Sequence, residues 1–150
     1  MIHQQKKTGI NELQTELQRK IQLYQHCYEL TQQIAKMVEE DNEDVVLRLL
    51  KRRDVIFHQI REVDEHIGAR EDIANLRTFS QQSPEIDVLW GQIQVFIQKI
   101  IAADGELFQQ MTAKRTETLN ALTRSHRRHR LAIAYQIAGA DQARFINTDQ

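Results

Sequence analysis

The sequence predicts an all-α protein, folded as an antiparallel bundle of three long helices with a short extra helix and a flexible C-terminal tail. Apolar residues recur every three or four positions over most of the chain, which is the period of an amphipathic helix. Only five glycines and one proline occur in 150 residues, too few for the many tight turns of a sheet protein. Glutamine, glutamate, leucine, alanine and arginine are plentiful, a composition that suits helices.

The first long helix is expected to run from about Ile10 to Glu40. Its main apolar stripe consists of Ile10, Leu13, Leu17, Ile21, Tyr24, Tyr28, Ala35 and Val38. At about 100° per residue, a second stripe lies roughly 100° around the helix and consists of Leu23, Cys27, Leu30, Ile34 and Met37. This helix therefore has two apolar faces to bury.

The second helix is expected to follow the acidic stretch 39–44 and to reach Ile67. Asp41 or Asn42 can cap its N-terminus, and Gly68 is well placed as its C-cap. Its main stripe consists of Val45, Leu49, Ile56, Ile60, Val63 and Ile67. A shoulder of Val46, Leu50 and Phe57 lies about 100° from this stripe and matches the second stripe of the first helix. The two helices together predict an αα-hairpin.

The third long helix is expected to begin at Pro84, with Ser83 as its N-cap, and to continue to about Ala138. Its apolar residues form one broad stripe: Ile86, Leu89, Trp90, Ile93, Phe96, Ile97, Ile100, Ile101, Leu107, Phe108, Met111, Leu119, Leu122 and Ile133. A helix of that length should extend beyond its neighbours. Asp104 lies on the stripe and precedes Gly105, so a bend or break is an open alternative there.

The whole chain, residues 1–150, is expected to form a single helical domain. Its core should span about residues 10–138, and the tail 139–150 should fray beyond the glycine at 139. Between residues 69 and 80, Ile73, Leu76 and Phe79 suggest the short extra helix.

The composition indicates a cytoplasmic protein. The formal charge is -1, so no overall field attracts nucleic acid or a membrane surface. The single cysteine excludes an internal disulfide and fits a reducing compartment. The N-terminus lacks the apolar run of a signal peptide, and no uninterrupted apolar stretch approaches the length of about 20 residues that a membrane span needs.

The chain carries no recognisable catalytic motif, so we expect no enzyme activity, cofactor or metal. It has no glycine-rich phosphate loop and no Glu-x-x-His motif of the di-iron bundles. His126 and His129 lie one turn apart on the apolar stripe, but two ligands do not make a metal site, and a packed or interfacial pair is favoured. Cys27 is expected to behave as a small buried hydrophobe.

A run of basic residues, 124–130, is the strongest local charge in the chain. Its arginines are Arg124, Arg127, Arg128 and Arg130. A solvated helix face is the favoured interpretation, and contact with an acidic protein surface is the first alternative. Nucleic acid is the second, although no aromatic residues interleave for base stacking.

The surplus apolar residues of the first two helices suggest a binding surface. Its candidate members are Leu23, Leu30, Ile34, Met37, Val46, Leu50 and Phe57. In a three-helix bundle each helix contacts two others, so a wide apolar arc can also serve packing alone. The alternative is a groove that accepts an amphipathic helix of another protein.

Two stretches of the sequence resemble flagellar export chaperones of the FliT type. The first is Tyr24-Gln-His-Cys-Tyr28-Glu-Leu30-Thr31-Gln-Gln-Ile34-Ala-Lys-Met37, continued after the acidic break by Val46-Leu47-x-Leu49-Leu50-Lys-Arg52-Arg53-x-x-x-Phe57-x-x-Ile60. The second runs from Ile100 to Leu119, and Ala143 to Asn147 is similar to the tails of FliT and FlgN relatives. The paired asparagines of many FlgN-type sequences are absent, which favours FliT.

The resemblance implies a small cytoplasmic chaperone of flagellum biogenesis and type III export. Such a chaperone holds an amphipathic terminal helix of an axial protein, the filament cap or a hook-associated protein, and presents it to the export apparatus. Independently of the resemblance, Phe145 and Ile146 form an isolated apolar pair beyond Gly139. If this pair folds back on the apolar groove, it competes with the client helix, so Tyr135, Phe145 and Ile146 are the predicted regulatory tail. A homodimer through the third helix is left open.

Overall fold

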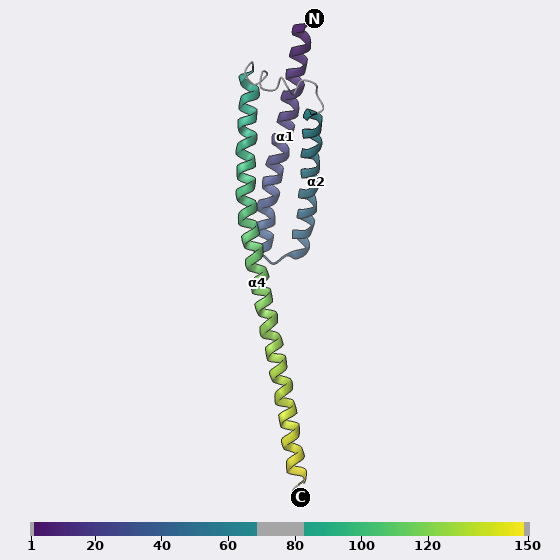
Figure 1. The fold of residues 1–150 in the computed structure, drawn as a ribbon, viewed down its shortest axis with the longest axis vertical. Helices are drawn as coiled ribbons and strands as arrows, with labels where there is room; N and C mark the ends of the chain where they lie inside the picture. Colours follow the sequence, from purple (N-terminus) through teal and green to yellow (C-terminus); the bar gives the residue numbers. More distant parts are fainter. Residues whose placement is uncertain (1, 69–82, 149–150) are drawn as a thin grey trace. The chain divides into compact units, whose positions relative to one another are not determined.

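The computed structural model describes residues 2–68 and 83–148, with side chains described for residues 9–68 and 83–139. These residues form three helices, α1 (Ile2–Glu39), α2 (Glu43–Gly68) and α4 (Pro84–Thr148), without any strand among them (Figure 1). The all-α prediction is therefore confirmed. The short helix expected between residues 69 and 80 lies outside the described residues. The chain divides into two compact units, the N-terminal unit Met1–Gln110 and the C-terminal unit Met111–Gln150.

A tight turn at residues 40–42 joins α1 to α2. The Asn42 N–H donates to the Met37 carbonyl (3.0 Å) and the Asp41 N–H donates to the Val38 carbonyl (3.2 Å), the paired bonds of a Schellman motif. Asp41 has a φ of 54°, in the left-handed region that aspartate tolerates better than most residues. The Val46 N–H donates to the Asn42 carbonyl (3.1 Å), which places Asn42 at the N-cap of α2. Of the two predicted caps, Asp41 ends α1 and Asn42 begins α2.

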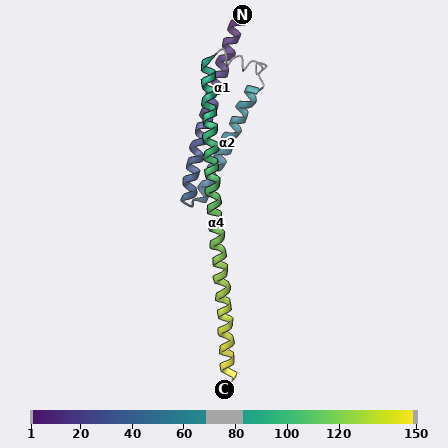
Figure 2. The ribbon, with the colours of Figure 1, turned by 60° about the vertical axis from the view of Figure 1, so that its left-hand side comes forward.

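From this turn, α2 runs back along α1. Lys20 of α1 pairs with Asp64 of α2, and Thr31 of α1 accepts a hydrogen bond from Arg53 of α2. Residue numbers therefore fall along α2 as they rise along α1. Both views show the two helices side by side (Figures 1 and 2).

The first part of α4 completes the N-terminal unit through buried residues spaced seven apart: Ile86, Ile93, Ile100 and Leu107. The residues three and four positions after each of these are half-buried, as far as Met111. This is the heptad pattern of a helix that packs along its neighbours through one narrow seam. One end of the core combines all three helices, through Leu13 and Leu17 of α1, Val63 and Ile67 of α2, and Ile86 and Ile93 of α4.

Two helix boundaries differ from the prediction, and one open alternative is decided. α1 begins at Ile2 rather than near Ile10. α4 is continuous through Asp104 and Gly105, where the sequence left a bend or break open. α4 also continues to Thr148, so the expected end of the helix near Ala138 is wrong. One glycine inside a helix costs only about 1 kcal/mol relative to alanine, and the neighbouring helix-favouring residues offset that cost.

The predicted stripe on α4 is wrong at Ile101 and Phe108, which are exposed, and beyond Met111. Leu119 and Leu122 are 52% and 53% exposed, and Ile133 is exposed as well. Continuing the heptad of Leu107 in steps of seven leads first to polar or small residues, namely Lys114, Ala121 and Arg128, and then to the exposed Tyr135. Leu119, Leu122 and Ile133 lie on other sides of the helix, a difference that a broad stripe of three-and-four spacing conceals.

Candidate functional site

The residues predicted to form a binding groove divide into two sets. Leu30 and Ile34 are 3% and 0% exposed, so they belong to the core and are not available to a partner. For these two residues the packing interpretation holds, because α1 has neighbours on both of its apolar faces. The other five are half-buried and retain surface that a partner could cover: Leu23, Met37, Val46, Leu50 and Phe57.

Next to the shoulder of α2 that Val46, Leu50 and Phe57 form, Arg53 makes polar contacts with both α1 and α4. Its Nη1 donates to Asp104 Oδ1 of α4 at 2.5 Å and to Thr31 Oγ1 of α1 at 3.1 Å. The Thr31 hydroxyl in turn donates to the Cys27 carbonyl at 2.9 Å. This network explains why an acidic residue occupies the apolar stripe of α4. The network was not predicted from the sequence, although an acidic residue on the α4 stripe, Asp104, and a basic residue on the α2 shoulder, Arg53, are a signal for it.

The Arg53–Asp104 pair sets the register between α2 and α4. The two helices run in opposite directions in this unit (Figure 1). Leu50, three residues before Arg53, is therefore level with Phe108, four residues after Asp104. By the same reasoning Phe57 is level with Ile101. We call the five residues concerned the α2/α4 surface: Val46, Leu50 and Phe57 on α2, and Ile101 and Phe108 on α4.

The α4 side of this surface is strongly exposed. Ile101 and Phe108 are 66% and 73% exposed, whereas Leu50 and Phe57 are half-buried. The Arg53 guanidinium lies 5.4 Å from the centre of the Phe57 ring, a cation–π contact that holds the ring beside the ion pair. The surface therefore combines apolar side chains with one central charged pair.

A second polar contact lies nearer the other end of the unit. Lys20 is buried, and its Nζ lies 2.6 Å from Asp64 Oδ1. The same ammonium lies 5.8 Å from the Tyr24 ring centre and 5.6 Å from that of Trp90. Burial, with Asp64 nearby, raises the pKa of the Tyr24 hydroxyl. Lys20 therefore joins α1, α2 and α4 as Arg53 does, and both contacts are structural.

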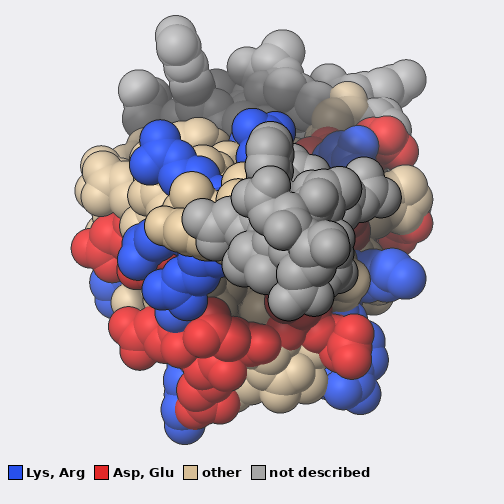
Figure 3. All heavy atoms as spheres, turned by 90° about the horizontal axis from the view of Figure 1, so that it is seen from below, with Lys and Arg blue, Asp and Glu red and all other residues tan. Residues whose placement is uncertain are grey.

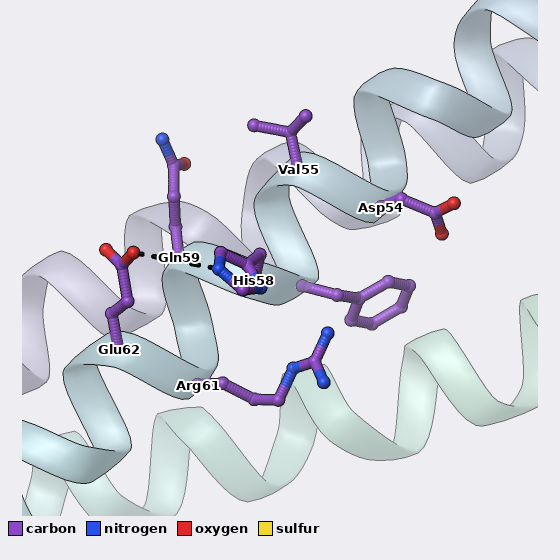
Figure 4. Close-up of a pocket in the computed structure, with 7 residues that line it drawn as sticks. Asp54, Val55, His58, Gln59, Arg61 and Glu62 are labelled. Carbon is purple, nitrogen blue, oxygen red and sulfur yellow. Dashed lines mark ion pairs between the residues drawn. The ribbon is translucent and has the colours of Figure 1, made fainter.

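The exposed side of α2 carries a shallow depression of about 800 Å³ (Figure 4). Its lining residues all come from this one helix: Asp54, Val55, Phe57, His58, Gln59, Arg61 and Glu62. His58 Nε2 lies 3.9 Å from Glu62 Oε1 across it, one helical turn away. A depression walled by one helix does not enclose a small molecule, so we assign it no ligand.

Cys27, His126 and His129 are the residues that the sequence offered for thiol or metal chemistry. Cys27 is fully buried, and burial raises the pKa of its thiol, which disfavours the reactive thiolate. Over the described side chains, no three residues of His, Cys, Asp or Glu come close enough to hold a metal ion. His126 and His129 are both exposed on α4.

The C-terminal unit presents both its basic run and its apolar residues to solvent. Arg124, Arg127, Arg128 and Arg130 are all exposed. So are six large apolar residues of this unit, namely Leu119, Leu122, Leu131, Ile133, Tyr135 and Ile137. The side chains of Phe145 and Ile146, the other members of the predicted regulatory tail, lie outside the described residues.

Charge on the molecule is mixed in sign. On the face shown in Figure 3, basic and acidic side chains lie close together, with tan surface between them. The described turn between α1 and α2 contributes exposed carboxylates: Glu39, Glu40, Asp41, Glu43 and Asp44. No uniform basic face of the kind that binds a nucleic-acid backbone is visible in this view.

Comparison with known proteins gives no relative: no family model, no curated protein and no solved structure matches the chain. By length and composition alone, α4 as far as Gly139 could cross a membrane, with a mean hydropathy of 1.2 in its most apolar window. Of that window 17% is buried, whereas the core helices of globular proteins that pass the same test are mostly buried; one such helix is weak evidence for a membrane span.

Proposed function

We propose that the protein is a non-enzymatic cytoplasmic export chaperone of the FliT type, built as an antiparallel bundle of three long helices. Its client is an amphipathic terminal helix of an axial flagellar protein, the filament cap or a hook-associated protein. The chaperone keeps this helix from assembling prematurely and delivers it to the export apparatus. The resemblance of residues 24–60 and 100–119 to that family motivates the choice of client.

The observation that carries the proposal is the exposure of Ile101 and Phe108 beside the α2 shoulder. Exposed neighbouring apolar side chains of this size are typical of a surface that another protein covers. The five residues of the α2/α4 surface lie along two neighbouring helices, so a client helix would rest between them with apolar anchors at helical spacing.

The energetics of such an interaction suit a transient partner. Burial of about 600 Å² of apolar surface, at about 25 cal/mol per Å², contributes about 15 kcal/mol before the costs of association and ordering. Those costs cancel much of the gain, so a dissociation constant near 1 μM is expected. An affinity of that order holds a client in the cytoplasm and still permits release during export.

The client of a chaperone of this kind must be kept unassembled because its terminal helices pack inside a polymer. Before assembly they expose apolar surface and associate with one another. Arg53 and Asp104, in the middle of the α2/α4 surface, would favour a client helix with a polar side chain at the corresponding position.

Isothermal titration calorimetry with the terminal peptide of the filament-cap protein from the same bacterium tests the proposal. The double variant Ile101→Gln/Phe108→Gln should weaken binding about tenfold or more, because it removes the exposed anchors. The matched control is Val88→Gln/Val95→Gln, two exposed apolar residues that are also seven apart but on another side of α4. Equal losses in both variants, or no binding by the wild-type protein, would refute the proposal.

A further inference from the structure

We infer that residues 119–133 of α4 form a coiled-coil seam that binds an acidic amphipathic helix of a partner protein. The seam lies in the C-terminal unit, whereas the α2/α4 surface lies in the N-terminal unit. The inference therefore stands or fails independently of the proposed chaperone function.

The spacing of the exposed residues defines the seam. Leu119, Leu122, His126, His129 and Ile133 follow one another at steps of three, four, three and four, the a and d positions of a heptad repeat. All five are exposed along a continuous helix. Leucine and isoleucine at such positions insert between the side chains of a facing helix, and this seam is distinct from the buried heptad that ends near Met111.

The charge of this segment indicates the chemistry of the partner. Residues 111–139 contain six basic side chains, one lysine and five arginines, and Glu117 is their only acidic residue. Arg115 precedes Leu119 by four positions and continues the seam, and Arg130 borders it directly after His129. Carboxylates on a facing helix would pair with these two guanidiniums.

The opposite border of the seam is uncharged and small. Thr118, Ser125 and Ala132 are seven residues apart, each directly before a seam residue. Side chains of this size let a facing helix approach closely along that border. The partner helix is thus expected to carry leucine-like residues toward the seam and glutamate or aspartate toward Arg115 and Arg130.

The same features disfavour two other occupants. A second copy of the chain would bring two strongly basic segments together, because the seam and the basic run overlap in the sequence. Nucleic acid would leave the apolar seam residues without a role, and residues 111–139 offer one aromatic side chain, Tyr135, for base stacking. An acidic helix satisfies both the apolar and the basic residues.

Fluorescence anisotropy of the full-length protein with a labelled designed peptide tests the inference. The peptide has about four heptads, with leucine at a and d and glutamate at e and g. We expect a dissociation constant on the order of 10 μM that weakens as salt is raised. A peptide with lysine in place of every glutamate should not bind, and its binding with similar affinity would overturn the inference.

Two pairs of variants test whether the seam itself makes the contact. Leu122→Gln/Ile133→Gln should weaken binding about tenfold or more, whereas Leu131→Gln/Tyr135→Gln, exposed residues on another side of the helix, should change it less than about twofold. Arg115→Gln/Arg130→Gln should weaken binding more than Arg124→Gln/Arg128→Gln, which removes equal charge away from the seam. Equal effects within either pair would mean nonspecific attraction and reject the seam.

Two further measurements address the other occupants. If sedimentation shows a dimer that Leu122→Gln/Ile133→Gln dissociates, the seam binds a second copy and the inference is wrong. If a DNA or RNA duplex displaces the peptide and binds more tightly, with a steep dependence on salt, the basic run is a nucleic-acid site instead.

Discussion

Two side chains that an apolar pattern does not explain, Arg53 and Asp104, determine how α2 and α4 meet. Both are partly shielded, and Arg53 also donates to the buried Thr31 hydroxyl. Loss of Asp104 leaves the Arg53 guanidinium, whose side chain is 17% exposed, without its carboxylate, which costs more than the pair contributes in total. The strength of the pair is therefore best measured as a coupling between the two residues.

We expect Asp104→Ala to lower the free energy of unfolding by about 1 to 3 kcal/mol, since it leaves the Arg53 guanidinium without its carboxylate. The double variant Arg53→Met/Asp104→Ala should be less destabilised than the sum of the single variants, by about 1 kcal/mol. Urea denaturation followed by circular dichroism measures this cycle, with the exposed Glu106→Ala as control. Strictly additive effects would show that the contact contributes nothing.

At Asp41 the backbone conformation, rather than a contact, is expected to determine stability. A φ of 54° strains every residue that has a Cβ atom, and glycine escapes that cost. Asp41→Gly should therefore be more stable than Asp41→Ala by about 1 kcal/mol, since both variants lose the same side chain. Thermal denaturation of the two variants measures the difference, and equal midpoints would place the strain elsewhere.

Much of the element-level architecture could be read from the sequence. The acidic turn after Met37, the capping role of Asn42 and the start of a helix at Pro84 all depend on local preferences, and the structure confirms each. The division of the α1 second stripe into buried Leu30 and half-buried Leu23 could not be read, because it depends on which neighbour covers each face. Periodicity gives the faces of a helix but not the identity of the element that covers them.

The stripe predicted on α4 shows that periodicity also does not separate buried from exposed residues along the length of one helix. Residues at three-and-four spacing stay within a broad arc for many turns, so Ile93 and Leu119 appeared equivalent in sequence. They differ in the structure because Leu107 is the last buried member of the heptad that includes Ile93, and Leu119 lies on another side of the helix. Steps of seven residues from Ile93 reach Ile100 and Leu107 but do not reach Leu119, so a strict spacing of seven separates the two residues in the sequence.

Alanine substitutions can measure that difference directly. Ile93 is 1% exposed, so Ile93→Ala should lower the free energy of unfolding by about 2 to 5 kcal/mol through lost burial and a residual cavity. Leu119→Ala should change it by less than about 0.5 kcal/mol, because the side chain is half exposed and alanine favours the helix. Urea titration of both variants is sufficient. A large loss for Leu119→Ala would mean that an unrecognised contact covers that residue.

At the scale of the whole molecule, the residues that stabilise the fold and the residues of the proposed seam lie in different parts of the chain. Every buried hydrophobic residue among the described side chains lies between Leu13 and Leu107. Residues 1–110 contain 13 Lys and Arg against 18 Asp and Glu, whereas residues 111–150 contain 7 against 3. The acidic N-terminal unit thus holds the core, and the basic C-terminal unit holds the exposed seam.

A truncated protein, residues 1–118, should separate the two proposed activities. Because it keeps the whole described core, its melting temperature should fall by less than about 5 °C, the shift that roughly 1 kcal/mol produces in a domain of this size. It should bind the filament-cap peptide through the α2/α4 surface and lose the acidic designed peptide, since the seam begins at Leu119. Circular dichroism and calorimetry on the same preparation measure all three properties. A truncated protein that fails to fold would make the C-terminal unit part of the cooperative structure, and one that still binds the acidic peptide would place that site outside the seam.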